Sequence, residues 1–417
     1  MNDNHAEVES EYKSRWIAPS LRQAAEEHPV VILSGARQVG KSTLLQEEMP
    51  FSKWRYLTLD NYDTLGQAER EPEALWAGTG HVVIDEVQKS PSLLSTIKQI
   101  VDQRKRKVRF VLSGSTNLSL LHNASESLAG RAVYLTLFPM TWGEISGADR
   151  SHLLETLFSG NFPAEDQIRE KKESPSDEMI RGFFPPVLTF SRSEGVLRWW
   201  EGYIATYLER DLRQIASVES LSDFRRVMEA LALRSGNVLN QTEIARDTGI
   251  SQSTIHRYTN LVEASSLLTR APAFSRNRTR RLIKSPKVYW VDPALAAYLS
   301  GYHEPKALDG AREGSALFET LVFLHLQVLS SLMVPRPRIS YWRTVTGKEV
   351  DFVLEWGKSL VAVEVKRTTT PRYADTLGLQ DFMKEYPETV AGLLVHGGTD
   401  IRRLHEKIVA VPWNALS

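Results

Sequence analysis

A glycine-rich segment early in the chain has the residue types and spacing of a phosphate-binding loop. Residues 35–42 fit the pattern G-x-x-x-x-G-K-[ST]. Its two glycines permit a tight turn whose N–H groups point at phosphate oxygens, and a following helix adds partial positive charge. We expect Lys41 to reach the β and γ phosphates of ATP and the Ser42 hydroxyl to hold Mg²⁺. The predicted nucleotide-binding residues are Gly35, Ala36, Arg37, Gln38, Val39, Gly40, Lys41, Ser42, Thr43 and Asp85.

Residues 81–86 are a second apolar run that ends in two carboxylates. This is a Walker-B pattern. Asp85 is expected to position the Mg²⁺ together with Ser42. Glu86, one residue beyond this metal ligand, is expected to act as general base on the attacking water. The alternative is a buried strand with two acids exposed at its end.

Two further signals bear on the same site. Ser115 and Asn117 follow an apolar run at 108–112, so either could sense the γ phosphate, or the segment could be an ordinary Ser/Gly turn. Arg131 precedes another strand-like run at 132–135. It is predicted either as an arginine finger acting on a neighbouring subunit or as a solvated or ion-paired arginine.

A second pattern with chemical meaning lies near the other end of the chain. It consists of Asp351 and, about one hairpin later, the sequence Glu-x-Lys at Glu364 and Lys366. Strand alternation places Glu364 and Lys366 on one face, and Asp351 on the adjacent strand can face them. Two carboxylates and a carbonyl suit Mg²⁺, and Lys366 could activate water, as in a magnesium-dependent nuclease. Glu319, on an apolar helix, is a candidate fourth member. The alternative is a set of strand-edge ion pairs.

The elements that must hold these groups are visible as hydrophobic periodicity. Alternating strands and helices from about 16 to 145 predict a parallel α/β sheet with nucleotide at the carboxyl ends of its strands. Mostly helical sequence follows, interrupted by a charged segment at 169–178 that we interpret as a surface loop.

Residues 240–258 have helix-turn-helix form. Asn240 caps the first predicted helix, Gly249 supplies the turn and Ser251 caps the second helix. The start of that second helix is where recognition helices touch DNA, although such units also serve as packing or oligomerisation modules. The predicted DNA-contacting residues of this helix are Gln252, Ser253, Thr254, His256 and Arg257.

A local basic cluster comes next, and it is either the wing of the same module or a solvated loop. In a chain of zero net charge it is the best available phosphate-binding patch. Its members are Arg270, Arg276, Arg278, Arg280, Arg281, Lys284 and Lys287, of which Arg276, Arg278, Arg280 and Arg281 are the predicted DNA contacts.

Composition limits the function classes. The chain has 417 residues, 51 basic and 51 acidic side chains, and no cysteine, which excludes disulfides, zinc–thiolate sites and iron–sulfur clusters. The polar, acidic beginning of the chain does not predict a signal peptide, and no apolar run is long enough to predict a membrane span. We therefore expect a cytoplasmic protein.

These motifs resemble a known family. Residues 35–42, 82–86 and 130–131 resemble those of archaeal-type AAA+ ATPases, and 207–211, 240–258, 287–292 and 349–366 resemble the domain of unknown function 4143 that accompanies them. The resemblance implies an α/β fold: an AAA+ parallel sheet (1–150), a helical lid (151–232), a winged helix (233–300) and a PD-(D/E)XK nuclease-like α/β domain (301–417). It implies a metal set of Ser42, Asp85, Glu319, Asp351 and Glu364, and catalytic residues Lys41, Glu86, Arg131 and Lys366. Arg210 is either a trans-acting finger or sensor, or a structural ion pair with Asp211 or Glu209.

The resemblance also implies a homo-oligomer, such as a hexameric ring, because AAA+ sites are usually completed by a neighbouring subunit. Three functions remain open at this point. The chain could hydrolyse ATP and act on duplex or branched DNA, with or without cleavage. It could be a nucleotide-operated switch in signalling or defence. Its C-terminal domain could also be a non-catalytic DNA-binding scaffold.

Overall fold

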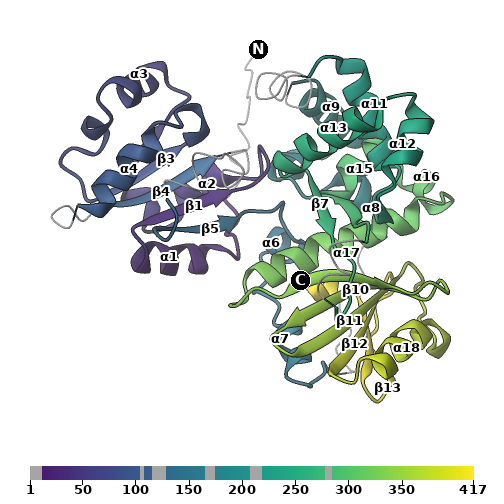
Figure 1. The fold of residues 1–417 in the computed structure, drawn as a ribbon. Helices are drawn as coiled ribbons and strands as arrows, with labels where there is room; N and C mark the ends of the chain where they lie inside the picture. The colour runs from purple at the N-terminus through teal and green to yellow at the C-terminus, as the bar shows by residue number, and fades with distance from the viewer. Residues whose placement is uncertain (1–11, 104–107, 115–127, 165–173, 207–217, 278–283) are drawn as a thin grey trace, which may run out of the picture.

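The computed structural model describes residues 12–103, 108–114, 128–164, 174–206, 218–277 and 284–417. Three sheets organise these residues. In Figure 1 the N-terminal sheet, in purple and blue, stands to one side of a green helical unit, and the C-terminal sheet, in yellow-green, lies below that unit.

The N-terminal unit is a parallel five-stranded sheet in the order β2-β3-β4-β1-β5. Its central strands are buried along most of their length, which explains their continuous apolar sequences. All five carboxyl ends share one edge of the sheet. The strands are β1 (Val30–Ser34), β2 (Arg55–Thr58), β3 (His81–Asp85), β4 (Arg109–Gly114) and β5 (Ala132–Thr136). The helices are α1 (Ala18–Glu27), α2 (Lys41–Glu47), α3 (Tyr62–Arg70) and α4 (Leu93–Asp102), with short 3₁₀ turns at Phe51–Lys53, Pro72–Trp76 and Val87–Lys89.

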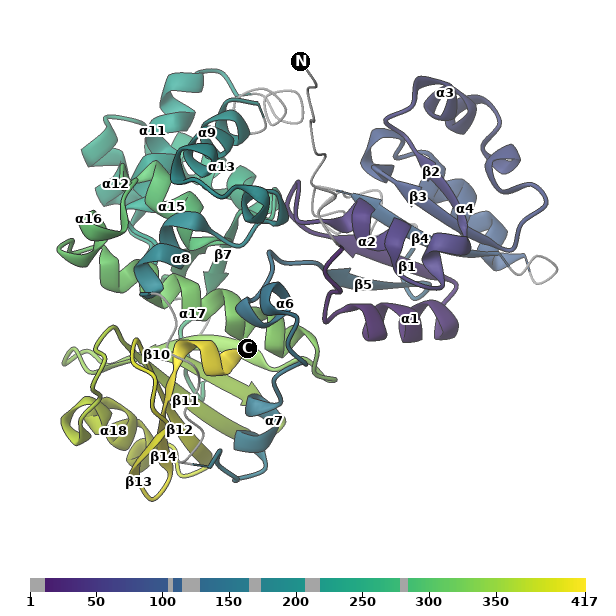
Figure 2. The same ribbon diagram turned by 180° about the vertical axis from the view of Figure 1, so that it is seen from behind.

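Two short helices carry the chain from this unit to the C-terminal sheet, α6 (Trp142–Ser146) and α7 (Leu153–Phe158). Helix α7 packs on β11 and β12, and α6 touches the last turn of the chain. Figure 2 shows this early segment lying against the late sheet. The boundary predicted at 150/151 therefore falls inside a segment that belongs spatially with the C-terminal domain.

The middle module spans residues 175–309. Its helix α11 packs on α12 and α13, while α8 packs on α15 and α16. The boundary predicted at 232/233 therefore lies inside one packed unit. A small antiparallel sheet in the order β6-β8-β7 completes this unit, with β6 between α11 and α12 and with β7 and β8 after α13. The elements are α8 (Pro175–Arg181), a 3₁₀ turn at Pro185–Thr189, α9 (Ser193–Tyr203), α11 (Leu221–Ala232), β6 (Asn237–Val238), α12 (Gln241–Thr248), α13 (Gln252–Ala264), β7 (Leu268–Ala271), β8 (Lys287–Trp290), α15 (Pro293–Leu299) and α16 (Pro305–Asp309).

The C-terminal domain is a mixed six-stranded sheet in the order β13-β14-β12-β11-β10-β9. Strands β9, β10 and β11 form antiparallel pairs, and β11, β12 and β14 run parallel. The elements are α17 (Gly314–Ser331), β9 (Arg338–Arg343), β10 (Glu349–Trp356), β11 (Ser359–Lys366), α18 (Leu377–Glu385), β12 (Thr389–His396), β13 (Arg402–His405) and β14 (Ile408–Pro412), with 3₁₀ turns at Tyr373–Thr376 and Trp413–Leu416.

Helix α17 joins the two later units. It lies between the middle module and the C-terminal sheet in both ribbon views, and it contacts β8 on one side and β11 on the other. Because it is covered on several sides, it is apolar nearly all round rather than amphipathic. Among the described residues, no helix is both long enough and apolar enough to cross a membrane.

Candidate functional site

The phosphate loop connects β1 to α2 as the motif predicts. Gly35 has φ +150°, and a Cβ there would lie 2.2 Å from the carbonyl oxygen of Leu137. Gly40 has φ +94° and immediately precedes α2. A side chain at either position would clash or strain the backbone, so the two glycines allow the close turn that phosphate binding requires.

Lys41 folds back over this loop. Its ammonium donates hydrogen bonds of 2.9 Å to the carbonyl oxygens of both Gly35 and Ala36. Burial lowers the pKa of Lys41 to about 8, although the charges of Glu86 and Asp85 oppose this shift. A phosphate group would offer the buried ammonium a full negative charge in place of two carbonyl dipoles. The lysine is therefore placed to exchange loop carbonyls for phosphate oxygens.

Asp85 is the centre of the polar cluster at the sheet edge. It is buried, and its Oδ2 accepts hydrogen bonds of 2.6 Å from both Ser42 Oγ and Tyr56 OH. Its Oδ1 accepts from Ser113 Oγ and from the backbone N–H of Glu86. Carboxylate and hydroxyl oxygens are the ligands that Mg²⁺ prefers. Ser42 and Asp85 are in direct contact, so these residues fit a magnesium ion held beside the phosphate loop.

Glu86 stands beside this cluster in a strained conformation. Its φ of +57° is left-handed, which is unusual for a residue other than glycine. Its carboxylate accepts a hydrogen bond from Gln88 Nε2. Burial, followed by the charge of Asp85, raises the pKa of Glu86 against the opposing charge of Lys41. A carboxylate beside a phosphate site needs such a raised pKa to act as a general base.

Sequence reasoning missed two residues of this cluster, Tyr56 and Ser113. Strand β4 continues to Gly114, so Ser113 lies level with Asp85 on the neighbouring strand. Tyr56 reaches Asp85 from β2 on the other side of β3. The predicted sensors Ser115 and Asn117 lie outside the described residues, as does Arg210.

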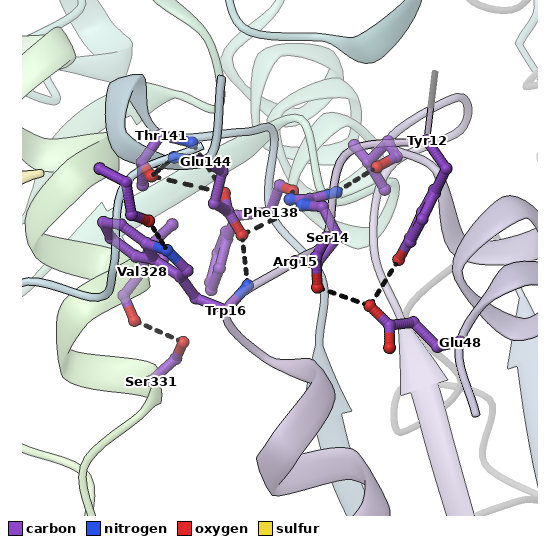
Figure 3. Close-up of polar contacts among 12 residues, drawn as sticks. Tyr12, Ser14, Arg15, Trp16, Glu48, Phe138, Thr141, Glu144, Val328 and Ser331 are labelled. Atoms are coloured by element: carbon purple, nitrogen blue, oxygen red, sulfur yellow. Dashed lines mark hydrogen bonds and ion pairs between the residues drawn. The ribbon is translucent and has the colours of Figure 1, made fainter. Parts of the chain in front are cut away.

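A buried arginine outside any motif supports the loop from behind. Arg15 donates to the carbonyl oxygen of Val39 at 2.8 Å and to that of Phe138 at 2.7 Å, and its Nε lies 3.1 Å from Glu144 Oε1. Figure 3 shows Glu144 joined to Arg15, to the backbone of Trp16 and to Thr141. The loop is thereby fastened to α6.

Arg131 is not part of the nucleotide site of its own chain. It precedes β5 and therefore lies at the amino end of the parallel sheet, opposite the edge that carries the phosphate loop. There it pairs with Asp102 at 2.6 Å. Its predicted role as a finger for a neighbouring subunit stays a prediction.

The start of α13 is exposed, as a DNA-contacting helix requires. Gln252, Ser253, His256 and Arg257 are exposed and Thr254 is half-buried. Ser251 caps the helix by accepting from the N–H of Thr254. Arg257 pairs with Glu219 at 3.0 Å, an exposed contact that contributes little energy and can be exchanged.

The basic cluster does not form one exposed patch. Arg276 pairs with Glu388 at 2.6 Å on the surface, and Arg270 pairs with Glu263 at 3.1 Å. Arg278, Arg280 and Arg281 lie outside the described residues. The inclusion of Lys287 in a phosphate-binding patch is wrong, because its side chain is only 4% exposed.

Lys287 lies instead among the carboxylates of the C-terminal domain. Its Nζ is 2.9 Å from Glu319 Oε1, 2.6 Å from Glu349 Oε1 and 3.6 Å from Asp351 Oδ1. Burial alone would lower the pKa of Lys287, but the charges of Glu319, Asp351 and Glu349 outweigh it and hold the pKa above its usual value. The ammonium is therefore charged throughout the neutral range.

The other members of the predicted nuclease-like set are close by. Lys366 Nζ lies 2.6 Å from Glu364 Oε1, and the N–H of Val365 donates to Asp351 Oδ2 at 2.9 Å. Burial and then the charge of Asp351 raise the pKa of Glu364. Within the described ranges, no three carboxylate or imidazole side chains are arranged to hold a metal ion. The set does not fit a resident divalent cation as it stands, because an ammonium lies between its carboxylates.

Comparison with known families divides the chain into three parts that correspond to the N-terminal unit, the middle module and the C-terminal domain. Residues 27–146 match the family described as AAA domain, 172–306 match a domain of unknown function (DUF8612) and 315–416 match a domain of unknown function (DUF4143). The chain therefore contains an AAA domain and a C-terminal DUF4143 domain, and it is an ATPase.

Relatives extend over nearly the whole length. Uncharacterized protein Rv2008c of Mycobacterium tuberculosis is 29% identical over 401 residues, covering 95% of this chain and 83% of the relative. Uncharacterized protein Mb2031c of Mycobacterium bovis has the same identity and coverage. Among solved structures, the Walker-type ATPase PABY2304 of Pyrococcus abyssi is 16% identical with a TM-score of 0.46, covering 69% of this chain and 96% of its own. The signal transduction ATPase PH0952 of Pyrococcus horikoshii is 10% identical with a TM-score of 0.26, covering 77% of this chain and 47% of its own.

Proposed function

We propose that this chain hydrolyses ATP in order to act on DNA, duplex or branched, through its middle module and C-terminal domain. ATP hydrolysis is supported by the contact between Ser42 and Asp85, next to a phosphate loop whose shape requires glycine at positions 35 and 40. The DNA half depends on the exposed first turn of α13.

In the ATPase step, Lys41 binds the β and γ phosphates and the loop N–H groups orient them. Ser42 and Asp85 would hold Mg²⁺, which would neutralise phosphate charge. Tyr56 and Ser113 keep both oxygens of Asp85 oriented. Glu86 takes a proton from water, and Gln88 positions that carboxylate. A finger from a neighbouring subunit, for which Arg131 is the candidate, would complete the site in a homo-oligomer such as a hexameric ring.

DNA binding is assigned to a winged-helix unit within the middle module. The chain order α11-β6-α12-α13-β7-β8, with the three strands joined in one antiparallel sheet, supports this assignment and puts α13 in the position of the recognition helix. Gln252, Ser253, Thr254, His256 and Arg257 would face the groove. Arg276, with Arg278, Arg280 and Arg281 from outside the described residues, would contact phosphates.

The middle module contacts the phosphate loop at two points, which would let it respond to nucleotide. Tyr203 OH donates to the carbonyl oxygen of Arg37 at 3.4 Å, and Pro185 lies against the Cα of Gly40, since a Cβ there would be 3.5 Å from its ring. Phosphate binding that reshapes the loop would therefore move the segment that leads to α9. This contact favours the second candidate function, a nucleotide-operated switch whose hydrolysis resets a protein–protein contact.

ATPase rates measured with and without junctions, hairpins and linear duplex test the first function. We expect stimulation by at least one DNA form and its loss in Lys41→Ala. Gln252→Glu should weaken DNA binding about tenfold, whereas Gln23→Glu, the same charge change at an exposed position of α1, should not. If the chain does not bind DNA at low salt and DNA does not stimulate its ATPase rate, DNA is not its substrate.

Light scattering with ATP and with ADP tests the second function, the nucleotide-operated switch. The switch is excluded if the particle size is the same with both nucleotides.

A further inference from the structure

The carboxylate cluster of the C-terminal domain already contains a cation supplied by the chain itself. Lys287 is the first residue of β8, in the middle module. Its three closest carboxylates come from two elements of the C-terminal domain, Glu319 from α17 and Glu349 and Asp351 from β10. An ammonium has three N–H groups, so these three carboxylates match its donors in number.

We infer that this cluster is a socket for the Lys287 ammonium and not a site for a divalent cation, and that its function is to fasten the middle module to the C-terminal domain. We call Glu319, Glu349 and Asp351 the lysine socket. The inference is independent of whether the chain acts on DNA, and it makes the C-terminal domain a non-cleaving scaffold.

Two ammonium groups of the chain, those of Lys287 and Lys366, already pair with oxygens that a metal would need. Tyr289 OH donates to Glu319 Oε1 at 2.5 Å, in addition to Lys287. Asp351 uses Oδ1 for Lys287 and Oδ2 for the N–H of Val365. Glu364 gives Oε1 to Lys366, which leaves its buried Oε2 without a hydrogen-bond partner. A cation at Glu364 Oε2 would meet the Lys366 ammonium on the same carboxyl group.

The lysine is also fixed by its surroundings. Its Nζ lies 5.8 Å from the ring centre of Tyr341, which covers it with an aromatic face. On the same strand, Tyr289 stacks on Phe323 of α17 with ring centres 4.1 Å apart. Because strand β8 packs here through an aromatic pair as well as through charge, Lys287 is held inside the cluster. A divalent cation could enter only if this ammonium left, since like charges repel strongly at such short range.

Mn²⁺ binding to the full-length chain, without nucleotide, tests the socket. Wild type and Asp351→Asn should bind the same amount of Mn²⁺, because neither has a metal site in the cluster. Lys287→Met keeps the length of the side chain but removes its charge. It should gain a Mn²⁺ site that disappears again in Lys287→Met/Asp351→Asn. A wild-type chain that binds one Mn²⁺ more than Asp351→Asn overturns the inference, as does a folded Lys287→Met that gains none.

A second measurement decides the matter if Lys287→Met does not fold. Thermal unfolding of Asp351→Asn with excess EDTA separates the two readings of the cluster. In the socket, Asp351 attracts a buried ammonium, so its neutralisation should lower the melting temperature. In an empty metal site that Lys287 does not enter, Asp351 would meet the like charges of Glu319 and Glu364 against the one ammonium of Lys366. Neutralisation would then leave the melting temperature unchanged or raise it, and either result contradicts the inference. Mn²⁺-dependent nicking of DNA by wild type that Asp351→Asn abolishes also contradicts it.

Discussion

Arg15 donates a hydrogen bond of 2.8 Å to the carbonyl oxygen of Val39, the residue before Gly40 in the phosphate loop. The same guanidinium pairs with Glu144 at 3.1 Å, and both side chains are buried. Loop shape therefore depends on an ion pair between the beginning of the chain and α6.

Arg15→Met should distort the phosphate loop and leave Glu144 buried without its partner. We expect about 3 kcal/mol lower stability and ATP affinity weakened about tenfold, because the loop carbonyls lose their support. Chemical denaturation and nucleotide titration measure the two effects. Arg22→Met, which breaks a more exposed pair with Glu48, is the control and should change neither quantity much. Unaltered ATP affinity in a stable Arg15→Met chain contradicts this role.

Tyr56→Phe removes one of the hydroxyls that orient Asp85. Burial and the hydrogen bond to Asp85 raise the pKa of Tyr56, so the phenol stays protonated and donates. Removing such a supporting donor typically lowers metal affinity 10- to 100-fold, and we expect about tenfold here. The measurement is the Mg²⁺ concentration that gives half-maximal ATPase rate. Tyr62→Phe, on exposed α3, is the control. An equal Mg²⁺ dependence in Tyr56→Phe and wild type would show that Tyr56 does not support the metal ligand.

Glu86→Gln and Lys41→Ala should separate chemistry from binding. Glu86→Gln removes the base but keeps the loop, so hydrolysis should fall about 10²- to 10⁴-fold while ATP still binds. Lys41→Ala should abolish turnover and weaken ATP binding, with the circular dichroism spectrum preserved. Both variants need single-turnover rates and nucleotide titrations. Substantial turnover in Glu86→Gln would assign the base to another residue.

Buried His325 predicts a loss of stability in acid. Its Nε2 accepts from the N–H of Trp142 and its Nδ1 faces the carbonyl oxygen of Leu321, so the ring is held neutral. Burial lowers the pKa of His325 from 6.5 to about 4. The unfolded chain thus binds the extra proton first, and this stability is present above pH 6.5 and is lost as the pH falls towards 4.

The expected loss is on the order of 3 kcal/mol, from about 1.4 kcal/mol per pKa unit. Asp292 titrates in the same range with the opposite sign, because burial raises its pKa to about 6. The measurement is therefore the difference in unfolding free energy between wild type and His325→Gln from pH 7 to pH 4.5. A difference that does not depend on pH would mean that His325 binds its proton equally readily in the native and the unfolded chain.

The local parts of the nucleotide site could be predicted from sequence because each motif is contiguous. Residues 35–42 and Asp85 lie at the carboxyl ends of parallel strands, and such ends meet at one edge of a sheet. Ser113 was missed because its strand was expected to end at Leu112, which shifted attention to the residues beyond it. Tyr56 and Arg15 belong to no motif, and their partners are distant in sequence.

Lys287 illustrates a different limit. All four residues of β8 are buried, so the strand shows no alternation that would reveal an inward-facing lysine. Several basic residues precede it within ten positions, namely Arg278, Arg280, Arg281 and Lys284, which made a surface patch the natural interpretation. Only the packing of β8 against α17 and β10 brings the ammonium to its carboxylates.

The packing of α7 on β11 and β12 has a consequence for how the molecule is made. During synthesis, residues 153–158 leave the ribosome long before the strands that they cover, so their apolar face must wait for more than half of the polypeptide to emerge. Truncation after the middle module would leave the apolar face of α7 exposed to water and would favour aggregation. Part of the core of the C-terminal domain, α7, is thus translated before the whole middle module, and β11 and β12 that it covers are translated after it.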